Sequence, residues 1–294
     1  MTDDDAAAPV MDTPQPEPPP AASVLAVVLV DFMKAHRGWG WMRLVAGASA
    51  YKAVPGLQSA KVMGSGHEGG FTLRPSATHQ GLLCRFDAAD AAMDFLHGEQ
   101  VQAYRARARE CWGGLLAISS ARGQWDQQPW GLSDAHSQQL SPQWQQRLHA
   151  GEAEGPALAP APVGVLTRAS IQPSKTTAFW RHAPATQASL DAASGCLLAM
   201  GLGEAPLLRQ CTFSLWDDVA AREAYARQGA HREASARAMR SPRRLSSPAA
   251  SPAPSPLALP RIMKNSAAAR LPRMPTKASR TRAVFMQAIM LSPL

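Results

Sequence analysis

The chain has 294 residues, of which 46% are hydrophobic, and it carries a formal net charge of +8. This length suits one large domain or two domains of ordinary size. The charge comes from one end: residues 241–294 hold nine Lys and Arg and no acid, whereas residues 1–240 hold 21 basic and 22 acidic residues. The nearly neutral body has no basic stripe interleaved with aromatics, which argues against a nucleic-acid-binding face.

The beginning of the chain differs from the rest in composition. Residues 1–20 hold six Pro and five acidic residues, so we predict a disordered leader over residues 1–22. This leader lacks the basic and apolar regions of a secretory signal. The apolar run at residues 23–30 is far shorter than the ~20 residues that span a bilayer. We therefore expect a cytoplasmic protein with reduced thiols, which contacts membranes at most peripherally.

Residues 23–125 are predicted to form one structural unit. The β-branched run "SVLAVVLVDF" (23–32) is the first strand, and an aromatic-bearing helix follows it. The second and third strands lie around "AKVMGSGHEGGF" (60–71) and "GLLCRFDAADAAMDF" (81–95), which leads into an Ala-rich helix. A last strand follows in "WGGLLAISSARGQW" (112–125). The resulting βαββαβ order is that of the ferredoxin-like unit.

Residues 161–240 are predicted to repeat this unit, after a linker at residues 126–160. The block "LLAMGLGEAPLL" (197–208) matches the first Met-Gly-x-Gly block, and "QCTFSLWDDVAAREAY" (210–225) repeats the junction of an aromatic residue with Asp. At these junctions, Asp87 and Asp217 are placed to be helix N-caps. We predict an α+β fold in which tandem ferredoxin-like repeats form a pseudo-twofold dimeric α/β-barrel-like sandwich.

The tail at residues 241–294 does not supply the closing strand that the second repeat needs. It contains nine Pro and eight Ser, which favours a disordered basic tail and a second repeat without its last strand. A helical turn or two is expected at residues 281–291. Two interpretations of the tail stay open: a shift of the reading frame near residue 240, or a natural linker or targeting tail.

Two Gly-x-Gly sequences raise the question of a phosphate-binding loop. Gly64-Ser65-Gly66 and Gly201-Leu202-Gly203 have no third glycine that opens a helix, and no Gly-Lys-Ser/Thr follows either of them. Each is expected to lie between two strands, so no helix N-terminus faces a phosphate. We predict tight turns in which glycine supplies a positive φ, and a close approach of a ligand to the backbone remains compatible with them.

The histidines and tryptophans are the candidate functional residues, because no HExxH or GxSxG motif is present. The candidate histidines, for which a surface or capping role is the alternative, are His67, His182 and His231. Four tryptophans are either core anchors or the lining of an apolar cavity between the two sheets, where a hydrophobic ligand would bind. These are Trp39, Trp41, Trp180 and Trp216.

Several separated blocks together resemble the spheroidene monooxygenase family of bacterial carotenoid ketolases. They are "VMGSGHEGGF", "YRARARECWGGLLAISSARGQW", "VGVLTRASIQPSKTTAFWRHAP" and "GLGEAPLLRQCTFSLWDD". The resemblance covers residues 23 to 240 and implies O₂-dependent oxidation of an acyclic carotenoid at C-2 to a keto group. It also implies haem as cofactor and reduced ferredoxin as electron donor. Family members continue beyond this point with an aromatic and acidic closing segment, which this chain lacks.

The resemblance implies roles in haem binding for the candidate residues, but it does not indicate which of the candidates has each role. The three histidines become candidates for one haem axial ligand, and Arg168, Arg181 and Arg209 become candidates for binding the haem propionates. Catalytic residues remain unassigned. One alternative is a noncatalytic haem- or polyene-binding module of the same fold, inactive because its second repeat is incomplete. Another is an interaction protein that acts through its basic tail at an anionic membrane surface.

Overall fold

The computed structural model describes residues 22–122, 124–126, 128–151, 162–171, 173–205, 209–227 and 282–291. The expected leader lies outside the described residues except for residue 22, and so do His231 and most of the expected tail. Among the described helices, none combines the length and the apolar character needed to cross a bilayer.

The first half of the chain forms four antiparallel strands with helices on one face. In chain order its elements are β1 (Val24–Phe32), α1 (Arg37–Ala46), β2 (Leu57–Gly66), β3 (Pro75–Phe86), α2 (Ala89–His97), α3 (Glu99–Arg105) and β4 (Ala108–Ser120). Three short 3-10 helices lie in the connections: η1 (Lys34–His36), η2 (Gly47–Tyr51) and η3 (His67–Gly69). The order of neighbouring strands is β4-β1-β3-β2.

The expected linker contains regular structure in its first part. A small hairpin of β5 (Gln124–Trp125) and β6 (Gln128–Pro129) is followed by α4 (Ala135–Gln138) and α5 (Pro142–Gly151). The second half then consists of β7 (Val163–Ser170), η4 (Pro173–Lys175), α6 (Thr176–Asp191), β8 (Cys196–Ala205), β9 (Arg209–Trp216), α7 (Val219–Arg227) and β10 (Arg282–Leu291).

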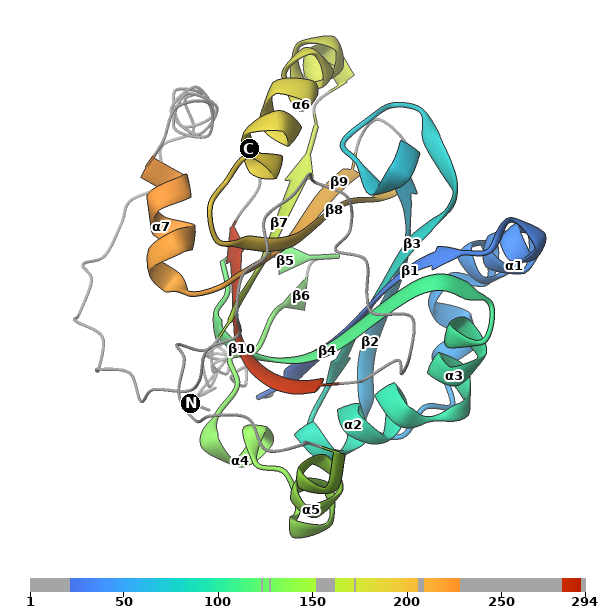
Figure 1. Cartoon of the computed structure of the whole chain (residues 1–294), viewed down its shortest axis with the longest axis vertical. Helices are drawn as coiled ribbons and strands as arrows, with labels where there is room; N and C mark the ends of the chain where they lie inside the picture. The colour runs from blue at the N-terminus through green and yellow to red at the C-terminus, as the bar shows by residue number, and fades with distance from the viewer. Residues whose placement is uncertain are drawn as a thin grey trace, which may run out of the picture.

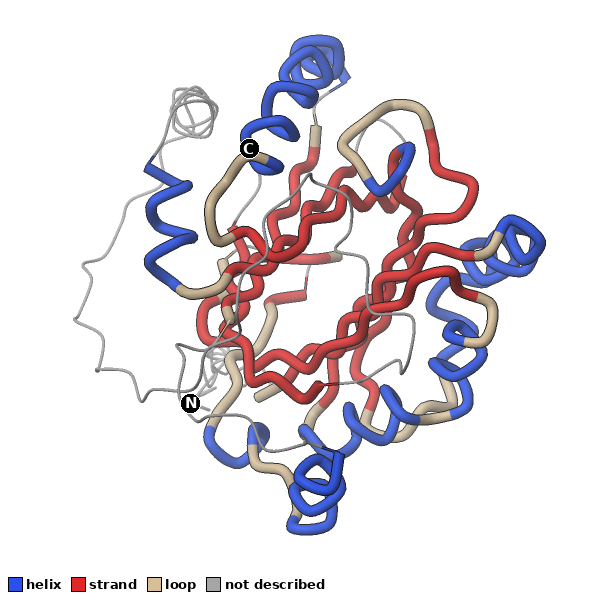
Figure 2. The backbone as a smooth tube through the Cα atoms, viewed as in Figure 1, coloured by secondary structure: helices blue, strands red, loops and turns tan. Residues whose placement is uncertain are grey.

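The eight long strands form a closed barrel in the order β1-β3-β2-β8-β9-β7-β10-β4. The helices lie outside this ring, α1 to α3 against the first half and α6 and α7 against the second (Figure 1). The same ring is seen in the backbone trace, with the strands enclosing a common interior (Figure 2). The expected mixture of helices with antiparallel strands is confirmed, whereas the tandem duplication itself stays a prediction.

The end of the chain differs from the expectation of a missing strand. Residues 282–291 form β10 rather than a helical turn, and β10 lies between β4 and β7. It runs parallel to both neighbours, with Ala288 opposite Ile118 on one side and Gly164 on the other. In a βαββαβ unit the last strand is antiparallel to the first, as β4 is to β1. β10 therefore occupies the position of the closing strand in the opposite direction.

Alternating residues of each strand separate two kinds of core. On β1, Val24, Ala26 and Val28 face the helices, whereas Leu25 and Val27 face the barrel interior. This two-residue period follows from the pleat of a strand. The interior cluster draws side chains from both halves, including Met63, and includes two tryptophans of the β5–β6 segment. The barrel is therefore held by one apolar interior and by outer clusters beneath its helices.

The two Gly-x-Gly sequences are not turns but the place where the two halves join. Gly64 pairs with Gly203 where β2 meets β8, and Ser65 Oγ donates a hydrogen bond to the Gly201 carbonyl at 2.5 Å. None of the four glycines has a positive φ. A Cβ on Gly201 would lie 2.5 Å from a ring carbon of Phe71, so the glycines permit close approach of neighbouring groups at this seam.

The predicted helix caps are displaced. The N-cap of α2 is Ala88, which makes no side-chain hydrogen bond, so Asp87 does not cap that helix. At α7 the carboxylate of Asp218, not that of Asp217, accepts a hydrogen bond from the Ala221 backbone N–H at 2.7 Å. The aromatic-Asp junction therefore marks the strand end correctly, but the helix starts later than the pattern indicates.

Candidate functional site

A buried carboxylate and a buried imidazole lie side by side on β1 and β3. Asp31 and His79 are direct partners in the ladder, and their residues are 1% and 5% exposed. His79 Nδ1 is 3.6 Å from Asp31 Oδ1 and 2.9 Å from Ser76 Oγ. Arg109, on β4, donates to Asp31 through Nε at 2.7 Å and through a second guanidinium nitrogen. We call Asp31, Ser76, His79 and Arg109 the histidine cluster.

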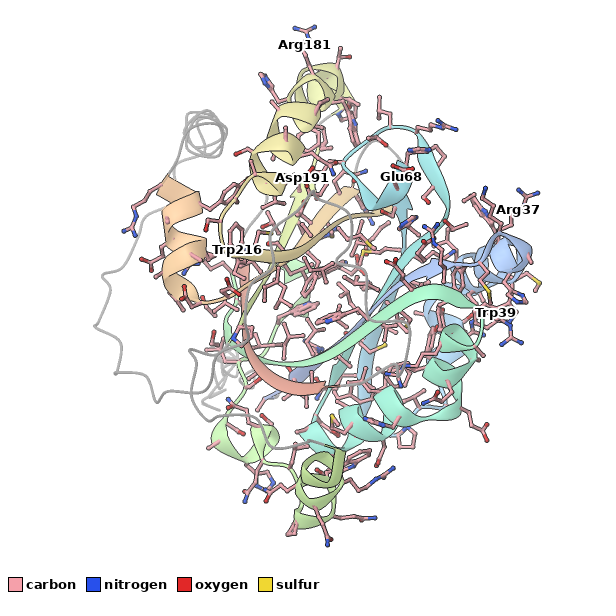
Figure 3. All side chains as sticks on the ribbon, in the orientation of Figure 1. Arg37, Trp39, Glu68, Arg181, Asp191 and Trp216 are labelled. Carbon is pink, nitrogen blue, oxygen red and sulfur yellow. The ribbon has the colours of Figure 1, made fainter. Side chains whose placement is uncertain are left out.

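Local structure explains how the histidine cluster is fixed. Ser76 Oγ accepts hydrogen bonds from the backbone N–H groups of Thr78 and His79, which holds the start of β3 against the imidazole ring. The other edge of the ring faces Gly69 of η3, where an added Cβ would lie 3.3 Å from His79 Cδ2 and 3.8 Å from Nε2. Glu68, labelled in Figure 3, lies on the same connection between β2 and β3. Its φ is positive, at 54°. The ring is therefore anchored at Nδ1 and bordered by bare backbone near Nε2.

The electrostatics of the histidine cluster favour a neutral imidazole. Burial lowers the pKa of His79, with Arg109 lowering it further while Asp31 raises it. A proton on Nδ1, facing Asp31 and Ser76, leaves the Nε2 lone pair free. Histidines that bind metals commonly engage their second nitrogen with a carboxylate or another acceptor in this way. The histidine cluster can thus present one oriented nitrogen ligand or exchange a proton.

A second polar cluster lies where the β5–β6 hairpin meets the barrel strands. Trp125 Nε1 donates to Glu204 Oε1 at 2.6 Å, and Lys61 Nζ is 3.8 Å from the same oxygen and forms an ion pair with Asp126. Arg168 lies 3.4 Å from Glu204 Oε2, with its guanidinium 5.2 Å from the ring centroid of Trp125. We call this set the hairpin cluster.

The hairpin cluster fixes aromatic side chains against the apolar interior. Trp125 stacks on Trp130 with centroids 5.4 Å apart, and both belong to the interior core with Leu166 and Phe213. Asp126 has a positive φ of 53°, which is uncommon outside glycine. In Figure 1 the two short strands lie within the outline of the barrel ring. The hairpin therefore contributes two tryptophans to the apolar interior of the barrel.

The structure does not bring the predicted histidines together. His67 lies on η3, close enough for its charge to act on the pKa of His79. His182 is exposed on α6, an outer helix, and His231 lies outside the described residues. Of the predicted arginines, Arg168 and Arg209 both act on the pKa of Asp126, whereas Arg181 points away from the body on α6 (Figure 3).

The four predicted tryptophans do not line one cavity. Trp39 and Trp41 both lie on α1. Trp39 packs into the outer core of the first half, whereas Trp41 is 45% exposed. Trp216 is buried between the second half of the sheet and the outer helices, and Trp180 contacts Phe179 on α6. The tryptophans that reach the interior are three others: Trp112, Trp125 and Trp130.

The alternation of inward-facing and outward-facing residues along the strands could have indicated His79 and Asp31 as candidate site residues. His79, Gly81 and Leu83 share one face of β3, and Leu83 faces the interior. The same alternation on β1 places Asp31 in line with Leu29 and Val27. A polar residue that continues an inward-facing apolar series is a candidate site residue.

The cysteines offer no reactive nucleophile. All four are free thiols. Burial raises the pKa of the Cys111 thiol to about 11 and that of the Cys211 thiol to about 12. Their thiolates are therefore scarce at neutral pH.

Comparison with known proteins gives three relatives of the same description, two of which are described here. The chain is 46% identical over 224 residues to spheroidene monooxygenase of Rubrivivax gelatinosus, covering 76% of this chain and 79% of that one. It is 31% identical over 174 residues to spheroidene monooxygenase of Rhodobacter capsulatus, covering 59% and 65% of the two chains. No model of a known protein family matches the chain.

Two solved structures are distantly similar to the chain. An aldoxime dehydratase in complex with butyraldoxime is 10% identical, with a TM-score of 0.43 over 74% of this chain and 75% of that one. An anthrone oxidase-like protein is 12% identical, with a TM-score of 0.26 over 74% and 85% of the two chains.

Proposed function

Because this chain belongs to the spheroidene monooxygenase family, we propose that it introduces a keto group at C-2 of spheroidene-type acyclic carotenoids. O₂ is the oxidant and reduced ferredoxin the electron donor in this proposal, and haem is the cofactor. The observation that carries it is the identity to the Rubrivivax relative over most of both chains. The apolar barrel interior supports it, since a long polyene needs an apolar binding site.

The reaction requires two successive two-electron oxidations at one carbon. Converting a methylene group to an alcohol inserts one oxygen atom of O₂, and the other atom leaves as water with two protons and two donated electrons. A second round gives a geminal diol, which loses water to form the ketone. The donor must therefore supply four electrons for each keto group formed.

The histidine cluster fits the proposed cofactor. Haem iron binds a single protein imidazole in many haem proteins and would supply O₂ activation here. Of the described candidates, His79 best meets the requirements of such a ligand: it is buried, its pKa is lowered, and its Nδ1 is held by Ser76 next to Asp31. We therefore add His79 to the candidates of the sequence, with His67 beside it on η3.

The remaining residues of the cluster then have positioning roles. Asp31 faces Nδ1 and fixes the ring orientation, while Arg109 balances the buried carboxylate of Asp31. The tryptophans of the hairpin and the leucines of β1 exclude water from the interior. Water exclusion favours oxidation of the bound polyene over loss of reactive oxygen species to solvent.

Product analysis tests the proposal. Purified holoprotein is incubated with spheroidene, ferredoxin, its reductase and O₂, and the extracted pigments are separated by chromatography. The proposal expects a 2-keto product that is absent without O₂ or without ferredoxin. Bound but unchanged spheroidene would indicate the noncatalytic polyene-binding module instead. That alternative was based on a missing closing strand, and β10 lies at the position in question.

A further inference from the structure

Helix α1 carries large apolar side chains on its solvent face. Trp41 is 45% exposed, Met42 63% and Val45 85%. Trp41 and Met42 are adjacent in sequence, and Val45 follows them by four and three residues. The three side chains therefore lie together on one side of the helix. A surface helix normally turns charged or polar residues to solvent, so this face is unusual for a helix in contact with water alone.

The opposite face of α1 is already occupied by the protein core. Trp39 packs against Phe32 and Tyr104, with ring centroids 5.7 Å and 5.0 Å apart. Gly40 lies against the Phe32 ring so closely that a Cβ there would be 2.7 Å from it. The exposed apolar residues therefore do not belong to the side of α1 that packs on the protein core. They form a second apolar surface, which we call the outer face of α1.

The surroundings of the outer face are cationic. Lys34 and Arg37 are exposed at the start of the helix, and Arg37 points away from the body (Figure 3). Lys52 is exposed just beyond the helix. From residue 32 to residue 56 the sequence contains four Lys and Arg and no Asp or Glu. An apolar face that contains tryptophan and is flanked by Lys and Arg has the composition of a helix lying in a membrane interface.

We propose that the outer face of α1 binds an anionic lipid bilayer, with Trp41, Met42 and Val45 inserted at the headgroup level and Lys34 and Arg37 contacting lipid phosphates. This surface is separate from the basic tail considered from the sequence. Charge complementarity favours an anionic bilayer over a second copy, because two copies of this cationic face would repel each other.

The position of α1 links the proposed surface to the histidine cluster. The helix follows the end of β1, where Asp31 lies. Gly40 on its inner face also approaches Gln80, the neighbour of His79, since a Cβ on Gly40 would be 3.3 Å from Gln80 Nε2. Binding through the outer face would therefore hold this end of the barrel near the bilayer, where a lipid-soluble substrate resides.

Vesicle cosedimentation tests the inference without carotenoid or turnover, so its result does not depend on the proposed reaction. The full chain is mixed with vesicles of phosphatidylcholine and phosphatidylglycerol, or of phosphatidylcholine alone. We expect binding to the anionic vesicles, and a partition coefficient at least roughly tenfold lower for the variant Trp41→Ser/Val45→Asn or Lys34→Gln/Arg37→Gln. Leu132→Asn, which alters a side chain 54% exposed elsewhere, should bind like the parent.

Three outcomes would overturn the inference. One is equal binding of the parent and both α1 variants, which would assign any lipid contact to another surface. Another is parent protein that does not bind anionic vesicles. The third is a concentration-dependent dimer that the Trp41→Ser/Val45→Asn variant abolishes, which would make the outer face an interface between two copies. Circular dichroism and thermal melting of each variant confirm that it is folded before binding is compared.

Discussion

His79 is the residue on which the proposed cofactor site depends. Its ring is anchored at Nδ1 by Ser76, and its Nε2 edge faces Gly69, which has no side chain. Neither His67 nor His182 combines burial with such an anchor in the structure. The difference lies in the surroundings of the ring, since all three residues have the same chemistry.

We predict that His79→Gly prevents stable haem binding, because the substitution removes the oriented nitrogen ligand. Haem titration of the purified apoprotein, followed through the Soret band, measures the effect independently of turnover. Added imidazole should restore the band in His79→Gly by occupying the vacated position. His182→Gly is the matched control and should titrate like the parent. Normal haem binding by His79→Gly, together with its loss in His67→Gly, would assign the ligand to η3 instead.

At the scale of elements, Glu204 is one of the residues that hold the β5–β6 hairpin to the barrel. This carboxylate is 15% exposed and accepts from Trp125 while facing Lys61 and Arg168. We predict that Glu204→Leu lowers the free energy of unfolding by about 1–3 kcal/mol, because it leaves part-buried donors without their acceptor. Chemical denaturation followed by circular dichroism measures this loss.

The matched control for that change is Glu223→Leu on α7. Glu223 is 45% exposed, and its ion pair with Arg227 is 3.4 Å long. Exposed pairs of this kind contribute about 0.5 kcal/mol or less. Equal losses for Glu204→Leu and Glu223→Leu would contradict the role assigned to Glu204.

The contact between α2 and α5 should depend on pH. Burial lowers the pKa of His97 below its ordinary value of 6.5, with Arg105 and Arg147 acting in the same direction. The neutral ring packs on Trp144 of α5 at a centroid distance of 4.9 Å. Because the unfolded chain takes up the proton more readily, this contribution to stability is complete above pH 6.5 and decreases as the pH falls through and below that value.

We predict that His97→Gln reduces the loss of melting temperature between neutral pH and about pH 5.5, since glutamine does not titrate in this range. Thermal melting at a series of pH values measures the difference. His36→Gln, on a short helix outside this contact, is the matched control for the loss of one histidine. A parent-like slope in His97→Gln would show that other groups control the acid sensitivity.

The sequence predicted whole elements better than it predicted junctions. The runs of β-branched residues located β1 and β7, because strand propensity and burial agree there. The Gly-x-Gly pairs were interpreted as turns because glycine is most often needed for a positive φ. Here the glycines permit close packing at the seam between β2 and β8, including contacts at Gly201 from residues distant in sequence. Because the contacting residues are distant in sequence, no pattern of neighbouring residues predicts such a contact.

The histidine cluster was not among the predicted residues, for a related reason. Asp31 and His79 are far apart in sequence, and only their pairing across β1 and β3 makes them neighbours. Three of the predicted tryptophans lie on the outer helices α1 and α6, and one lies on strand β9. The last of these, Trp216, lies beneath outer helices rather than in the interior.

At the scale of the whole molecule, closure of the barrel depends on β10. This strand completes the ring between β4 and β7, although it lies in a segment expected to lack strands. We predict that Ala288→Pro lowers the free energy of unfolding by about 3 kcal/mol or more, because proline removes a backbone donor from a strand with neighbours on both sides. Denaturant unfolding measures the change.

Val284→Pro is the control for that substitution, because it lies at the irregularity between Arg282 and Met286 in the pairing with β4. It should cost less than Ala288→Pro. If neither substitution alters stability, β10 does not close the barrel in solution, and the edges of β4 and β7 must be covered in another way.

The proposed function is the transfer of oxygen from O₂ to an acyclic carotenoid. It is tested most directly by mass spectrometry of the carotenoid after incubation with holoprotein, reduced ferredoxin and isotopically heavy O₂, beside a parallel reaction in isotopically heavy water. We expect the keto oxygen to carry the heavy isotope from O₂ and not from water. Spheroidene recovered without any added oxygen, or a keto group labelled only from water, would contradict it.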